Sequence, residues 1–351
     1  MKKAKKWLSL TLSGVLLTTA LAGCSSGTGP SSSTETSGND SESLPTYTCI
    51  GTPDSQISAA LTIADKKGFD TESGVDLNLR MTPSGPDLAS LVAGGGCDIA
   101  FASNYSVMTW INNDLDMTVI AVNDNMGGTQ GAAIQSSIKL SSPKDLEGLK
   151  LGLLPGSEVE IAFRKLCAQY NVDYDKITKV PIQPADQLSA FEKGDIDICS
   201  SWEPWITYAE NAGGKFLLSG TKCNIPGVPE DVDFMNIFST ISVTRDMMNN
   251  HKDDLSKVMQ AINKATDFIN NNREEAVSIL SKEFEIEASD LTKIMERNIY
   301  EFGVTDKYKT TTQELYDYMI QNKILTKDFA FDDFHDFSIL QSALPDNYKL
   351  S

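Results

Sequence analysis

The sequence has few of the side chains that carry out acid–base or metal chemistry. Only two histidines occur in 351 residues, His251 and His335. No His-Glu-x-x-His, Gly-x-Ser-x-Gly or Gly-Lys-Ser/Thr motif is present. The run Gly94-Gly95-Gly96 precedes a strand-like segment and opens no helix, so it indicates a turn. We therefore expect no catalytic residues, no metal site and no cofactor.

Cysteine and positive charge are also limited. No Cys-x-x-Cys spacing occurs among the six cysteines, which disfavours a redox or metal role. Cys49, Cys97, Cys167 and Cys199 lie in apolar patterns and are expected to be buried hydrophobic residues, whereas Cys223 lies in a loop and has no clear role. The formal net charge of −18 argues against nucleic acid and against adhesion to anionic lipid.

The N-terminus has the pattern of an export signal. Four lysines within the first six residues precede an uncharged apolar run, Trp7–Ala22, which is short for a membrane span. The tetrad Leu21-Ala22-Gly23-Cys24 resembles the bacterial lipobox, which implies cleavage after residue 23 and a lipid on Cys24. The alternative is a secreted protein with a chance cysteine. Residues 24–45 are mostly small and polar, and they are expected to form a flexible linker between lipid and body.

The remaining body contains the same pattern of strands and helices twice. Strand-like and helix-like runs alternate over 47–111, and the order recurs from Lys150. The best match places 87–99 against 186–198, where five of thirteen residues are identical. Alternating strands and helices indicate mostly parallel sheets, so two copies predict two α/β lobes. We expect lobe 1 to comprise 46–128 and 235–351, and lobe 2 to comprise 129–234.

Ligands of such open sheets bind beyond the carboxyl ends of the strands. Four segments follow predicted strands here, at 52–56, 103–105, 155–158 and 202–205. If the lobes face each other, all four converge on one cleft. The candidate ligand-binding residues of these segments are Thr52, Asp54, Gln56, Ser103, Asn104, Gly156, Ser157, Glu158, Trp202 and Glu203.

Each candidate also has a structural alternative. Ser157 follows a glycine at a predicted helix start, where free backbone N–H groups suit an anionic or polar group, but it can equally be a helix cap. The same holds for Ser103 and Asn104. Trp202 with Glu203 suits a flat apolar group or a cationic nitrogen. Trp205 is as suited to core packing as to ligand contact.

The C-terminal third has a different pattern. Four segments carry apolar residues at helical spacing, namely 254–270, 274–282, 289–300 and 312–322. These helices are expected to brace lobe 1 and to take no part in ligand binding.

Several motifs resemble one known family. Ser142-Pro-Lys-Asp-Leu-Glu-Gly-Leu-Lys-Leu-Gly-Leu-Leu-Pro-Gly-Ser157, the run 183–197 and Trp202-Glu-Pro-Trp205 are similar to the nitrate/sulfonate/taurine-type solute-binding proteins of ABC importers, together with thiamine-pyrimidine binding relatives. The resemblance implies a type II periplasmic-binding-protein fold whose two lobes are joined by hinge strands and close on a ligand.

The function implied is that of a monomeric, lipid-anchored receptor on the extracytoplasmic face, which delivers a small polar organic molecule to an ABC permease. The four loops contain no basic residue, which disfavours an inorganic anion and favours a zwitterion, an amine or a neutral heterocycle. The alternatives are a ligand-sensing lipoprotein coupled to a membrane signalling receptor or, with less support, an enzyme on the same fold.

Overall fold

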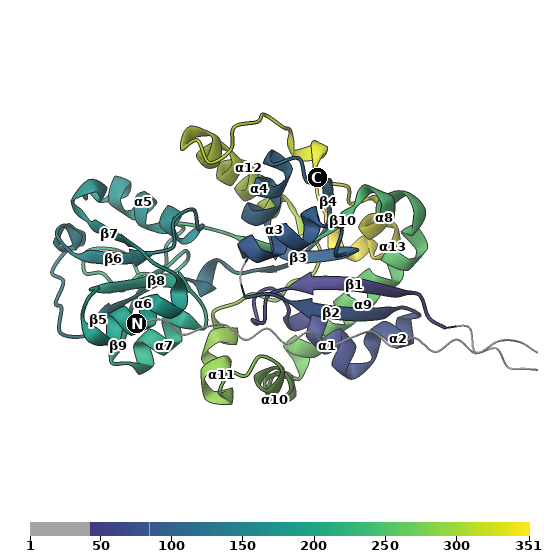
Figure 1. Cartoon of the computed structure of the whole chain (residues 1–351), viewed down its shortest axis with the longest axis horizontal. Coiled ribbons are helices and arrows are strands. Elements are labelled where there is room, and N and C mark those ends of the chain that lie inside the picture. Colours follow the sequence, from purple (N-terminus) through teal and green to yellow (C-terminus); the bar gives the residue numbers. More distant parts are fainter. Residues whose placement is uncertain (1–42, 84) are drawn as a thin grey trace, which may run out of the picture. The chain divides into compact units, whose positions relative to one another are not determined.

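Two five-stranded sheets form the frame of the protein (Figure 1). The computed structural model describes residues 43–83 and 85–351. The predicted signal peptide, Cys24 and nearly all of the predicted linker lie outside the described residues. The first sheet has the strand order β2-β1-β3-β10-β4, the second has the order β7-β6-β8-β5-β9, and β11 pairs with β12.

The strands and their bounds are β1 Thr46–Gly51, β2 Asp76–Met81, β3 Ile99–Ser103, β4 Met117–Asn125, β5 Gln130–Gln135, β6 Lys150–Leu153, β7 Thr178–Pro181, β8 Ile198–Trp202, β9 Gly214–Ser219, β10 Phe238–Thr244, β11 Val304–Thr305 and β12 Tyr348–Lys349. The α-helices are α1 Ala59–Lys67, α2 Phe69–Ser73, α3 Gly85–Ala93, α4 Asn104–Asn112, α5 Val159–Gln169, α6 Pro184–Lys193, α7 Trp205–Asn211, α8 Arg245–Asn250, α9 Lys252–Asn271, α10 Arg273–Glu283, α11 Ala288–Glu296, α12 Asp306–Gln321 and α13 Ser338–Ala343. Short 3₁₀ turns cover Gly127–Thr129, Pro143–Leu146, Tyr174–Lys176, Phe331–Asp333 and Pro345–Asn347.

The repeat predicted from the sequence is visible in hydrogen bonds as well as in topology. The Asp98 carboxylate accepts the backbone N–H of Thr48 at 2.7 Å, at the start of β1. Its counterpart Asp197 accepts the N–H of Lys150 at 2.8 Å, at the start of β6. In each sheet a strand that lies outside the repeated pattern, β10 or β5, pairs antiparallel beside the parallel strands. The mixed α/β fold of two sheets is therefore confirmed.

The chain changes sheet twice. It leaves the first sheet after β4 and enters the second at β5, and it returns between β9 and β10. We call the part built on the first sheet lobe 1 and the part built on the second sheet lobe 2.

Amphipathic helices cover the sheet of lobe 1. In Figure 1, α1, α2 and α9 lie on one side of this sheet, and α3 and α4 lie on the other. Helix α9 buries a stripe of apolar residues at spacings of three and four, namely Leu255, Val258, Met259, Ile262, Ala265 and Ile269. It packs against α1 and α2. This burial supplies most of the helix's stability, since the free energy gained is about 25 cal/mol per Å² of apolar surface removed from water.

The cysteines of the described chain are all buried, and their thiols are free: Cys49, Cys97, Cys167, Cys199 and Cys223. Burial raises the pKa of the Cys97 and Cys167 thiols to about 11. These residues therefore serve as small packed hydrophobic side chains, and Cys223 belongs with the other four.

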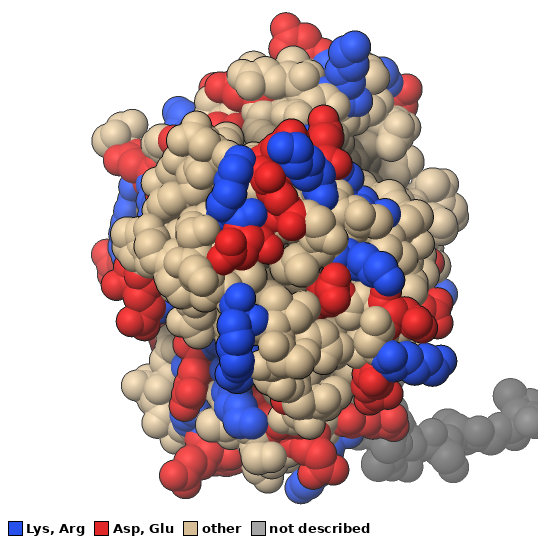
Figure 2. Space-filling view, turned by 90° about the vertical axis from the view of Figure 1, so that its left-hand side faces the viewer, with Lys and Arg blue, Asp and Glu red and all other residues tan. Residues whose placement is uncertain are grey.

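The surface mixes both signs of charge. Figure 2 shows the face of lobe 2 with basic and acidic side chains side by side and no large patch of either sign. Ion pairs of this lobe include Lys144 with Glu147 and Arg164 with Glu160. Among the described residues, no helix has both the length and the hydropathy needed to cross a membrane.

The C-terminal third does more than brace lobe 1, so that expectation was wrong in one respect. Helix α11 contacts α7 of lobe 2, and the Asn211 amide donates to the Asp290 carboxylate at 2.9 Å. The helix predicted over 289–300 ends at Glu296, which frees the next residue to turn toward lobe 2. That residue is Arg297.

Arg297 forms a buried ionic cluster with two glutamates of lobe 2. One guanidinium nitrogen contacts Glu203, and the other donates to Glu210 at 2.8 Å. The Glu203 side chain has no exposed surface, and burial raises the pKa of its carboxyl while Arg297 opposes that rise. The backbone N–H of Thr207 donates to the same carboxylate at 3.0 Å. A charge buried in this way is stable only while its partners remain.

Replacing Arg297 should therefore destabilise the protein strongly. In Arg297→Met, Glu203 stays buried without its cation, and the free energy of unfolding should fall by about 3 kcal/mol or more. The matched control is Arg245→Met, because Arg245 and Asp116 form an exposed pair worth about 1 kcal/mol or less. Urea unfolding of both variants measures the difference, and equal losses would contradict a structural role for the buried cluster.

Candidate functional site

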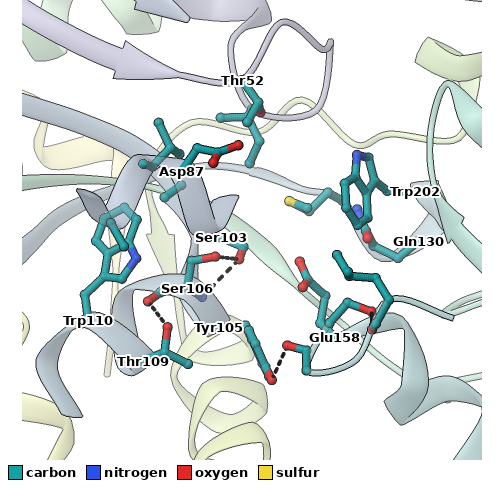
Figure 3. A pocket seen from close by; sticks show the side chains of 18 of the residues that line it. Thr52, Asp87, Ser103, Tyr105, Ser106, Thr109, Trp110, Gln130, Glu158 and Trp202 are labelled. Atoms are coloured by element: carbon teal, nitrogen blue, oxygen red, sulfur yellow. Dashed lines mark hydrogen bonds between the residues drawn. The ribbon is translucent and has the colours of Figure 1, made fainter. Parts of the chain in front are cut away.

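A pocket of about 580 Å³ lies between the two lobes, a size usual for small-molecule sites. Loops after β1, β3, β6 and β8 contribute to its lining, so the carboxyl ends of strands from both sheets meet there. Parallel strands dictate this arrangement, because their carboxyl ends share one edge of each sheet. Figure 3 shows side chains from both lobes pointing into the same space.

The structure brings eight of the ten predicted site residues together around this pocket. From lobe 1 they are Thr52, Asp54, Gln56 and Ser103, and from lobe 2 they are Gly156, Ser157, Glu158 and Trp202. Asn104 and Glu203 do not belong to the lining. The two histidines also lie elsewhere: His251 contacts Tyr47, and His335 packs against Phe331 and Tyr308.

The placement of Asn104 and Glu203 corrects the sequence prediction. The Asn104 side chain is fully buried, where its amide donates to Thr312 at 3.0 Å and its oxygen accepts the N–H of Phe238 at 3.2 Å. It thereby ties the start of α4 to β10 and α12. Glu203 is held in the Arg297 cluster. The polar atoms of both side chains are thus paired within the protein. Both residues stabilise the segments that carry pocket residues, and neither lines the pocket.

Asp54 turns the loop after β1 and faces the pocket. Its carboxylate accepts the N–H of Ile57 at 2.9 Å. Burial raises the pKa of Asp54 to about 6, and the hydrogen bond from Ile57 offsets only part of this rise in pKa. No basic side chain belongs to the pocket lining. Asp54 is therefore a buried acid without a cationic partner among the lining residues.

The segment that leads into α5 brings Gly156, Ser157 and Glu158 of lobe 2 to the same pocket as Asp54 of lobe 1. Gly156 has φ of +78°, which favours glycine, and its carbonyl accepts the Tyr105 hydroxyl at 2.9 Å. The Ser157 hydroxyl donates to Leu154 O at 2.9 Å. Glu158 stands at the N-cap position without a side-chain capping hydrogen bond, and burial raises the pKa of its carboxyl.

Two tryptophans flank the pocket. Figure 3 shows Trp202 and Trp110 on opposite sides of the space, Trp202 at the end of β8 and Trp110 on α4. Trp205 lies outside the lining and packs edge-on against Tyr208, with ring centroids 5.9 Å apart. Of the two alternatives for Trp205, core packing and ligand contact, the structure therefore matches packing.

Sequence reasoning missed one whole side of the pocket. Helix α4 lines it with Ser106, Thr109, Trp110 and Asn113, which share one helical face. The apolar residues Val107, Met108 and Ile111 of the same helix predict that the opposite face packs in the core. The remaining face could therefore have been predicted to border the pocket. Asp87, Gln130 and Gln183 also line the pocket, and nothing in their local sequence distinguishes them.

Direct hydrogen bonds join the lobes at the pocket. The Tyr105 hydroxyl of lobe 1 donates to Gly156 O, and Gln56 Nε2 donates to Glu203 O at 2.9 Å. These bonds tie the start of α4 and the loop after β1 to the segments that precede α5 and α7.

The buried charge of Asp54 should make stability depend on pH. A carboxyl whose pKa is higher in the folded than in the unfolded state keeps its proton better when folded, so stability decreases as the pH rises from about 4 to about 7. Asp54→Asn carries no such charge, and its melting temperature relative to wild type should increase across this interval. Asp195→Asn, which removes an exposed carboxylate, serves as the control and should show no such trend. Differential scanning fluorimetry at several pH values tests this, and a constant difference for Asp54→Asn would contradict the desolvation of its carboxylate.

Comparison with known proteins gives relatives over most of the chain. A protein of Bacillus subtilis (strain 168), named for the binding of aliphatic sulfonates, is 22% identical over 298 residues, which cover 82% of this chain and 85% of the relative. Among solved structures, the ligand-binding component of an ABC-type import system from Staphylococcus aureus matches with a TM-score of 0.69 and 18% identity, covering 85% of this chain and 99% of that one.

The same fold also occurs in an enzyme, the desulfurization enzyme DSZB. A variant of the desulfurization protein DSZB, solved with biphenyl-2-sulfinic acid, matches with a TM-score of 0.66 and 13% identity, covering 86% of this chain and 99% of the other. The fold alone therefore does not separate binding from catalysis. The model of the NMT1/THI5-like family matches residues 56–276, which include loops of both lobes around the pocket. The chain thus belongs to the NMT1/THI5-like family.

Proposed function

We propose that the protein is the solute receptor of an ABC importer, which binds a small polar organic molecule between its lobes and delivers it to a membrane permease. The observation that carries this proposal is the pocket lined by strand ends of both sheets. A ligand that contacts both lobes stabilises their closed arrangement, and a permease can then recognise that arrangement. The names of the relatives from Bacillus subtilis and Staphylococcus aureus support the same role.

Binding is favoured over catalysis by the chemistry of the lining. The pocket residues include no cysteine, histidine or lysine, so the usual nucleophiles and bases other than carboxylates and hydroxyls do not face it. The two histidines and the five cysteines of the described chain lie in packed positions outside the pocket.

The test of this proposal is a thermal-shift screen of small metabolites followed by calorimetry. A true ligand at a hundred times its dissociation constant should raise the free energy of unfolding by about 2.7 kcal/mol. Trp202→Ala should weaken its binding by more than about 1 kcal/mol, because the indole forms a wall of the pocket. Trp205→Ala is the matched control and should bind normally, since Trp205 lies outside the lining.

Two results would count against the receptor. One is a screen in which no compound stabilises the protein. The other is a ligand whose affinity falls in Trp205→Ala while it is unchanged in Trp202→Ala.

We also propose that Cys24 carries a lipid anchor, with residues 24–45 as the tether. The support is the tetrad Leu21-Ala22-Gly23-Cys24 after a basic and apolar start. Expression in a bacterial host should give a mature chain that begins at a modified Cys24 and partitions into detergent, whereas Cys24→Ala should be released or remain unprocessed. Intact-mass spectrometry of the membrane fraction checks both, and an unmodified N-terminus at another residue would refute the anchor.

A further inference from the structure

The pocket between the lobes contains many hydrogen-bond acceptors and no basic side chain. Three carboxylates line it, from Asp54 and Asp87 of lobe 1 and from Glu158 of lobe 2, and none of the lining residues is lysine, arginine or histidine. In Figure 3 the labelled carboxylates of Asp87 and Glu158 point into the same space. An anionic ligand would meet the carboxylates of Asp54 and Glu158 there and no basic side chain of the lining.

Two buried amide oxygens reinforce this preference. Gln56 and Gln130 line the pocket and are each only 1% exposed, and the side-chain oxygen of each has no hydrogen-bond partner among the described residues. Gln56 already uses its Nε2 to donate to Glu203 O, so its oxygen remains for another donor. A buried acceptor without a donor costs roughly 1–3 kcal/mol, so a ligand with N–H groups gains by approaching these oxygens.

The start of α5 presents a carboxylate at the pocket. Glu158 stands at the N-cap of α5, and its side chain makes no capping hydrogen bond to the helix. The neighbouring Ser157 hydroxyl donates to Leu154 O. A sulfonate or carboxylate that approached the backbone N–H groups of this helix end would meet the Glu158 carboxylate beside them, and the two negative charges would repel each other.

The positions of the acids match a ligand that joins the lobes. Asp54 lies on the loop after β1 and Glu158 at the start of α5, so the two carboxylates approach the pocket from different lobes. Each is desolvated without a cationic partner in the lining, and a positive charge between them would compensate both. The Trp202 indole flanks this space and favours a cation or a flat ring, whereas Trp110 borders it while almost fully buried in the core of lobe 1.

Building on the proposed function, we propose that the ligand is an organic cation with several N–H donors, such as an amidinium or an ammonium compound. Asp54 and Glu158 hold its charge from opposite lobes, Gln56 and Gln130 accept further N–H groups, and Trp202 covers its apolar part. These four polar residues thereby determine specificity, and they separate this receptor from one that selects a sulfonate.

The experiment compares compounds that share a scaffold and differ in charge. One series is benzamidine, benzamide and benzenesulfonate, and a second is butylammonium, butanol and butanesulfonate. Calorimetry at pH 7.5 should show in each series that the cation binds at least about tenfold more tightly than the anion or the neutral compound, as expected for charged hydrogen bonds.

Charge-removing variants assign the effect to residues. Asp54→Asn and Glu158→Gln should each reduce the affinity for the cation by about tenfold and leave the affinity for the neutral compound nearly unchanged. Asp195→Asn, on an exposed turn, should behave as the wild type. Because the measured quantity is a ratio between compounds on the same variant, a change in overall stability does not imitate it.

The outcomes separate this inference from the proposed function. Preference for the sulfonate, or a cation preference unchanged in both Asp54→Asn and Glu158→Gln, would overturn the cationic ligand and leave a receptor of another specificity. Failure of every cation to bind would also overturn it, and the metabolite screen would then decide the receptor function on its own.

Discussion

The junction between the lobes buries several carboxylates, and each of them needs a donor or a cation to compensate its lost hydration. The chain compensates one of them itself, because Glu203 has Arg297 and the N–H of Thr207. Asp54 accepts the backbone N–H of Ile57, and no basic side chain lines the pocket beside Asp54 or Glu158. The compensated acid stabilises the fold, and the two acids without a cation in the lining face the pocket.

This division also explains how the C-terminal third contributes to function without lining the pocket. Arg297 follows α11 and reaches the start of α7, next to the end of β8 where Trp202 lies. Asn104 connects the start of α4 to α12 in a similar way. Helices distant in sequence therefore fix the orientation of the loops that carry pocket residues. Contacts that hold loops in one orientation keep a binding site preorganised, which reduces the entropy lost when a ligand binds.

The sequence predicted the parts of this structure that depend on local pattern. The repeat identified both sheets, and Asp98 and Asp197 proved to be equivalent residues. Eight of the residues that line the pocket followed from the rule that ligands bind at strand ends. Long-range pairing was not predictable, because nothing near Glu203 indicates a partner at Arg297. Trp110 and Gln130 were also missed. Trp110 enters the pocket from a face of α4, and Gln130 enters it from β5, a strand outside the repeated pattern.

The central claim, that the carboxylates of both lobes hold one ligand cation, is tested most directly by a crystal structure with the organic cation that binds most tightly. The account predicts a ligand nitrogen within about 3 Å of the carboxylates of Asp54 and Glu158, beside the Trp202 indole. A ligand bound outside the interlobe pocket, or one that directs an anionic group at the start of α5, would contradict it.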